Sequence, residues 1–129
     1  MAQIYFLSII YLFLSACFLL VDKYGSIFLF LINLKTFYYS KKSYPTIFMA
    51  TGLVLAAGLL FLPMSPGPII LGDFIPAVNI LIDVFYFFHQ EHKDKTNSFT
   101  VNNSKRNALG FVTLGVSVFH FLFPFIVLL

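Results

Sequence analysis

Long apolar stretches separated by short polar connections dominate the hydrophobic pattern of this chain. Four of them approach the roughly 20 residues that a helix needs to cross the hydrocarbon core of a bilayer. They occupy residues 3–21, 46–62, 68–88 and 108–129. Backbone amides and carbonyls surrounded by lipid must pair within their own segment, so each stretch is predicted to be a helix. The predicted fold is therefore all-α, a polytopic transmembrane helix bundle of four spans forming a single integral membrane domain, residues 1–129.

A fifth apolar piece, residues 24–34, has only eleven residues before Lys35. That length is short for a span. We expect this segment to lie along the membrane interface or to extend the first helix. The alternative is a fifth span, which would move the N-terminus to the other side of the membrane.

Basic residues gather in two of the connections. Residues 22–45 carry four lysines, and residues 89–107, predicted to form a cytoplasmic loop, carry the remaining four basic residues. The link between the second and third helices has none. Because basic loops stay on the cytoplasmic side, four spans place both termini outside (N-out, C-out).

The link between the second and third helices is rich in proline. Each proline fixes φ, and a glycine among them permits a sharp turn. The pattern predicts a rigid exterior turn, with a re-entrant segment as the alternative. The turn residues are Pro63, Pro66, Gly67 and Pro68.

Composition agrees with a membrane location. The 129 residues are 60% hydrophobic and 10% charged, whereas a soluble domain carries about 25% charged residues. The net charge of +3 follows the loops and does not suggest a nucleic-acid partner. We interpret the chain as an integral protein of the bacterial inner (cell) membrane, whose partners are the lipid bilayer and either other membrane subunits or further copies of itself.

Cys17 is the only cysteine, so no intrachain disulfide can form. The sequence LSAC at residues 14–17 matches a lipoprotein cleavage pattern. However, no basic residue precedes the apolar stretch as a signal peptide requires. We favour a helix that is retained whole, with lipoprotein processing as the alternative.

Polar and small residues inside the apolar stretches recur at helical spacing, which places them on one face of each helix. We expect these faces to turn inward, where small residues allow close packing and polar groups bond across helices. Asn79, Asp83, Ser117 and His120 are predicted to form an intramembrane polar cluster. The faces comprise Gly72, Pro76, Asn79 and Asp83; Gly110, Thr113, Ser117, His120 and Pro124; and Ser8, Tyr11, Ser15, Phe18 and Asp22.

An ionisable residue inside the membrane costs about 2.5–3.5 kcal/mol on insertion scales, so Asp83 needs an explanation. It could be paired structurally, serve a proton or ion pathway, or meet a counter-charge on a partner subunit. Asp73 differs from Asp83. It is interpreted as a helix N-cap followed by Pro76 in the first turn, which would shorten the third helix to about residues 74–89.

Chemical motifs are scarce. His89 and His92 could share a helix face and are the candidate metal ligands, but their spacing does not match H-E-x-x-H and no third ligand suggests itself. No nucleotide-binding or hydrolase motif is present, so we expect no catalytic residues and no cofactor. A membrane enzyme that uses His120 or the His89 and His92 pair is the least favoured hypothesis. The favoured function is an accessory or structural subunit of a membrane complex. The alternative is an oligomeric small transporter or channel, holin-like or proton/ion-coupled, that uses the Asn/Asp/His cluster.

Overall fold

The computed structural model describes residues 2–61, 73–94 and 103–123. Within these ranges the chain forms five helices and no strand, which confirms the predicted all-α class. The helices are α1 (Ala2–Tyr24), α2 (Leu29–Tyr39), α3 (Ser43–Phe61), α4 (Phe74–Asp94) and α5 (Asn103–Leu122).

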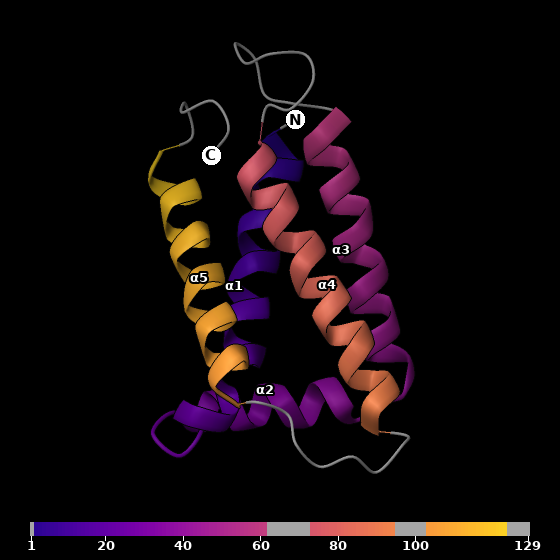
Figure 1. The fold of residues 1–129 in the computed structure, drawn as a ribbon, viewed down its shortest axis with the longest axis vertical. Helices are drawn as coiled ribbons and strands as arrows, with labels where there is room; N and C mark the ends of the chain where they lie inside the picture. Colours follow the sequence, from indigo (N-terminus) through magenta and orange to yellow (C-terminus); the bar gives the residue numbers. More distant parts are fainter. Residues whose placement is uncertain (1, 62–72, 95–102, 124–129) are drawn as a thin grey trace.

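Four long helices lie side by side, and the short helix α2 lies across one end of them (Figure 1). Successive long helices run in opposite directions, so the start of α1 and the end of α5 are both at the end away from α2. α1 packs most extensively against α5, and α3 against α4. The bundle is therefore two closely packed helix pairs that meet along an interior seam.

The short helix overlaps only the second half of the predicted interfacial segment and continues beyond it. Residues 24–34 were expected to form it, but α1 continues to Tyr24 and α2 extends from Leu29 to Tyr39. The backbone N–H of Gly25 still donates to the carbonyl of Val21, at 2.7 Å. The turn between α1 and α2 occupies the first residues of the apolar piece. α2 therefore begins further along the chain than predicted and includes Lys35.

α4 begins directly after Asp73, as the N-cap interpretation anticipated, and not at residue 68. The backbone N–H of Ala77 donates to the carbonyl of Asp73 at 3.2 Å, which is the first helical bond of α4. Pro76 is buried within this first turn, where its missing N–H is tolerated. The four residues of the predicted exterior turn, Pro63, Pro66, Gly67 and Pro68, lie outside the described residues.

The predicted loop over residues 89–107 was too long at both ends. α4 continues to Asp94 and α5 already begins at Asn103. Hydropathy placed the helix ends where the apolar residues stop. A helix can continue into polar sequence, because water can hydrogen-bond to its polar side chains and to the unpaired backbone groups at its end.

Among the described residues, two helices are long and apolar enough to cross a membrane by composition alone, Gln3–Tyr24 and Ser43–Phe61. α4 and α5 have similar lengths, but α4 ends and α5 begins in polar sequence. Of the four predicted spans, two meet this criterion of length and composition among the described residues, so the four-span bundle stays a prediction.

Candidate functional site

The predicted inward faces of α1, α4 and α5 lie inside the bundle. Apart from Asp22 on α1, their described polar side chains are almost wholly removed from the surface, although α1, α3, α4 and α5 all expose large apolar side chains outside. The polar groups therefore lie at the interior seam, where α1, α4 and α5 come together. The buried polar residues of these faces are Ser8, Ser15, Asn79, Asp83, Thr113, Ser117 and His120.

Asp83 on α4 is 0% exposed and faces Thr113 on α5. The Thr113 hydroxyl lies 3.0 Å from Asp83 Oδ1 and 3.3 Å from Oδ2, and it donates to the carboxyl group. Asn79, one helical turn earlier on α4, donates from Nδ2 to Thr113 Oγ1 at 3.1 Å and lies 3.5 Å from Asp83 Oδ2. We call Asn79, Asp83 and Thr113 the central triad. All of its donors are uncharged.

Two hydroxyl groups on α1, Tyr11 Oη and Ser15 Oγ, are buried one helical turn apart and interact with each other. The Tyr11 side chain reaches across to α3 at Gly52. A Cβ added at Gly52 would lie 2.2 Å from Tyr11 Oη and 2.6 Å from Val84 Cγ2. Glycine at this position therefore lets α1, α3 and α4 approach closely, next to the central triad.

His120 does not join Asp83. It lies in the last turn of α5, because this helix ends at Leu122. Its ring lies 4.5 Å from the Tyr5 ring, and Nε2 is 3.4 Å from Ser8 Oγ. The Tyr5 hydroxyl donates to the His120 carbonyl.

Asp73, which precedes α4, belongs to the same end of the molecule as His120. Burial raises the pKa of the Asp73 carboxyl above its ordinary value, and the nearby charge of His120 opposes this rise. Ser117 is separate from both groups, since its hydroxyl donates to the carbonyl of Ile9 on α1 at 3.4 Å. The four residues of the predicted cluster thus occupy three places along the seam.

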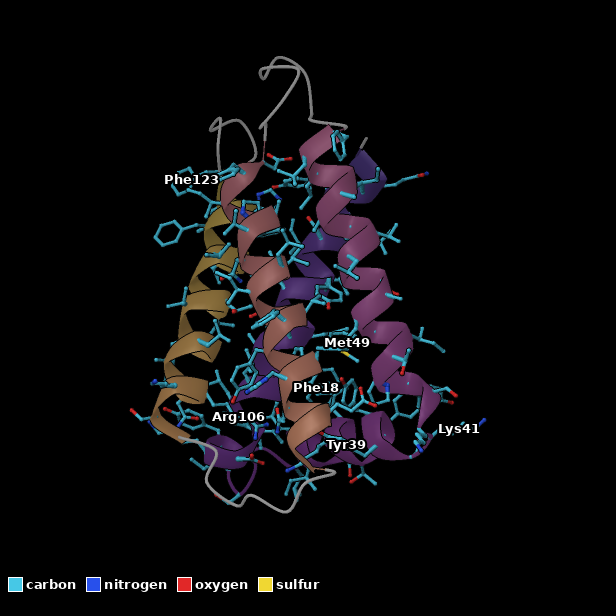
Figure 2. All side chains as sticks on the ribbon, turned by 45° about the vertical axis from the view of Figure 1, so that its right-hand side comes forward. Phe18, Tyr39, Lys41, Met49, Arg106 and Phe123 are labelled. Atoms are coloured by element: carbon cyan, nitrogen blue, oxygen red, sulfur yellow. The ribbon has the colours of Figure 1, made fainter. Side chains whose placement is uncertain are left out.

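A second polar site, which the sequence pattern did not reveal, lies at the end of the bundle near α2. Arg106 of α5 is 6% exposed. It donates to the Asp22 carboxylate and, from Nη2, to the carbonyl of Phe18 at 2.8 Å. Lys35 of α2 donates to the other Asp22 oxygen at 2.6 Å. We call Asp22, Lys35 and Arg106 the terminal ion cluster; it joins α1, α2 and α5, and Figure 2 shows Arg106 at this end.

The candidate metal ligands lie at the end of α4. His89 is exposed, and the side chain of His92 is outside the described set. Within the described residues, no group of three or more His, Cys, Asp or Glu side chains could hold a metal ion. Cys17, with the rest of the LSAC sequence, lies inside the unbroken helix α1.

A protein-family model matches residues 1–120, so the chain belongs to that family, one of unknown function. No curated protein and no solved structure matches the chain.

Proposed function

We propose that this chain is an integral membrane protein in which α1, α3, α4 and α5 span the bilayer and α2 lies in the interface. The observation that carries this proposal is the large apolar side chains exposed on all four long helices. Exposure is 59% for Phe6, 72% for Val54, 71% for Phe85 and 61% for Phe121. Soluble monomers rarely expose continuous apolar surface on this scale. A bundle with polar side chains inside and large apolar side chains outside is stable when lipid surrounds it.

The lengths of the helices agree with this arrangement. α3, α4 and α5 contain 19, 21 and 20 residues. At 1.5 Å per residue each is about 30 Å long, the thickness of the hydrocarbon core. The polar end of α4 and the polar start of α5 are at the end that carries α2, where they would reach the headgroups.

The side chains of α2 suit a helix that lies in an interface. Tyr38 is buried against the bundle. Asn33 and Thr36 are exposed on the opposite face, while Phe30 and Phe37 are exposed on a flank at 64% each. A helix lying flat beneath the spans would turn its polar face to water and its aromatic flank to lipid, as interfacial helices do.

Topology can be tested by labelling single cysteines in a Cys17→Ser background with a membrane-impermeant maleimide. The basic residues at the α2 end should face the cytoplasm. Cysteines at Lys41 and Lys105 should therefore label from the same, cytoplasmic side, and a cysteine at Gln3 from the other. Labelling of Lys41→Cys and Lys105→Cys from opposite sides would contradict the four-span arrangement.

Within the membrane we propose a non-catalytic role as an accessory or structural subunit. Support comes from the central triad, in which a fully buried carboxyl group is held by neighbouring hydroxyl and amide donors. A wide apolar groove of about 870 Å³ between α3 and α4 offers a place for a partner helix. Thr46 and Ala50 in its wall are small enough to let a second helix approach closely.

The groove predicts where a partner would be cross-linked. A photo-reactive amino acid at Ala50 should give one defined adduct with a membrane subunit or a second copy. The same group at Val112, which is 56% exposed on α5, serves as the control and should label lipid. Equal labelling from both positions would argue against a partner in this groove.

A transporter or channel is the second candidate, because Tyr11 Oη and Ser15 Oγ add two buried hydroxyls to the interior that holds the central triad. Such groups could line a polar route through an oligomer. Purified protein in liposomes should then carry protons or ions, and Asp83→Asn should abolish the flux, with His120→Ala as a second variant. Flux no greater than that of empty liposomes would exclude this candidate and favour the subunit role.

A further inference from the structure

A second groove opens on the outside of the bundle between α1 and α3, and α2 closes one end of it. Its volume is about 310 Å³. Buried aromatic rings form the floor, including Tyr11, Phe18 and Tyr38, whereas the walls include the exposed side chains of Ile10 and Ile47. The groove is therefore apolar, narrow and open towards the space that lipid would occupy.

The length of this groove corresponds to one leaflet of a bilayer. Its lining on α1 extends from Leu7 to Phe18, and on α3 from Tyr44 to Leu55. Eleven helical steps amount to about 16 Å, roughly half of the 30 Å hydrocarbon core. A partner helix crossing the membrane would need a groove along the whole bundle, whereas a single acyl chain needs only this length.

The end of the groove at α2 is aromatic and positively charged. Phe37 and Tyr44 stack with ring centroids 5.1 Å apart, and both line the groove. Lys41 Nζ lies 5.7 Å from the centre of the Tyr44 ring. Lys41 and its neighbour Lys42 are exposed, and Figure 2 shows Lys41 at this corner of the molecule. At the corresponding end, the larger groove between α3 and α4 has Glu91 instead.

We propose that the groove between α1 and α3 binds one anionic phospholipid of the leaflet that faces α2. One acyl chain lies along the floor of Tyr11 and Phe18, and the phosphate group meets Lys41 and Lys42. The opposite charge of the headgroup selects this groove over the one that ends at Glu91. This inference rests on the proposed membrane location, but it does not depend on the subunit role.

The test is native mass spectrometry of the purified protein with added phosphatidylglycerol or phosphatidylcholine. Each lysine near a headgroup contributes a factor of about 5 to binding, so we expect the anionic lipid to bind about 25-fold more tightly. The double variant Lys41→Glu/Lys42→Glu should lose this preference. Lys105→Glu, an equally exposed basic residue at the same end on α5, is the control and should keep it.

A second pair of variants tests the groove apart from its charge. Thr51 lines the groove between α1 and α3, and Thr46 lines the other groove; both are exposed on α3. Thr51→Phe should fill the acyl-chain groove and weaken binding of both lipids about 10-fold, whereas Thr46→Phe should leave it unchanged. Photo-reactive phosphatidylglycerol in liposomes should label Ile47 and its neighbours.

Three results would overturn the inference: equal affinity for the two lipids, the same loss with Lys105→Glu as with the double variant, or equal effects of Thr51→Phe and Thr46→Phe. Failure of the membrane location would look different, because the protein would then leave washed membranes without detergent. A protein that stays in the membrane yet shows no lipid preference contradicts only the lipid site.

Discussion

Asp22 and Asp83 are two carboxylates of one bundle with entirely different surroundings. The Asp22 side chain is 38% exposed and is bound by two cations, Lys35 and Arg106. Asp83 is 0% exposed and is bound by a hydroxyl and an amide, from Thr113 and Asn79. The first joins helices by charge, and the second by neutral hydrogen bonds.

The difference follows from depth in the bundle. An ion pair in a dry interior must repay the desolvation of two ions, which costs several kcal/mol each. Near the end of the bundle, solvent reaches Asp22 and lowers this cost. In the middle, uncharged donors satisfy Asp83 without bringing a second charge out of water. Each of the following variants tests this distinction through unfolding by SDS in mixed micelles.

The largest effect is expected for Asp22→Asn. Arg106, with a side chain 8% exposed, would keep its buried charge but lose its counter-charge. Removing one partner from such a pair costs about 3 kcal/mol. The double variant Asp22→Asn/Arg106→Met should recover much of this loss, because no unpaired charge remains. A loss below about 1 kcal/mol for Asp22→Asn would show that solvent already screens the terminal ion cluster.

Thr113→Val should come next. Valine keeps the shape of threonine but removes the hydroxyl that donates to Asp83 and accepts from Asn79. Leaving buried polar groups without a partner costs about 2 kcal/mol. Thr51→Val is the matched control, because the exposed Thr51 hydroxyl bonds only to the carbonyl of Ile47 in its own helix; its change should stay within about 0.5 kcal/mol. Equal losses would remove the special role of the central triad.

Asp83→Asn makes the comparison between the two carboxylates direct, since it is the same substitution as at Asp22. The new amide can still accept a hydrogen bond from Thr113, and interhelical hydrogen bonds in membranes contribute about 0.6 kcal/mol on average. The loss should therefore remain below about 1 kcal/mol. A loss as large as that of Asp22→Asn would mean that the Asp83 charge itself stabilises the bundle.

The smallest effect is expected for Lys35→Ala. The Lys35 side chain is 41% exposed, and an exposed ion pair contributes about 0.5 kcal/mol. The loss in the free energy of unfolding should become smaller still at high salt, because salt screens the ion pair. A loss that matches Asp22→Asn and resists salt would show that α2, rather than α5, holds the terminal ion cluster together.

Sequence patterns predicted the inward faces because helical spacing is a local property. Asn79 and Asp83 are one turn apart, so any helix places them on the same side. The same argument could not find Thr113 as the partner of Asp83, since that contact depends on the register between α4 and α5. It also could not find Arg106, which meets Asp22 from 84 residues away and looked like an ordinary loop cation.

The sequence pattern also could not predict how far along the bundle each residue lies. Predicted helix ends followed the loss of apolar residues, so the start of the last helix was placed five residues late. The shift of α2 has the same origin, because the apolar piece includes the turn at Gly25. Positions along a bundle depend on where helices begin, and capping and turn geometry decide that.

The close packing of α1 against α5 has a consequence for how the protein is made. The ribosome releases α1 first and α5 last, so the earliest helix waits for its main neighbour while most of the chain is translated. α3 and α4, which follow one another, can meanwhile close as a hairpin. During this interval the serines of α1 and the carboxyl group of Asp83 lack the neighbours that cover them in the finished fold. Chains that stop before α5 should therefore be cut by proteases more readily than the finished bundle.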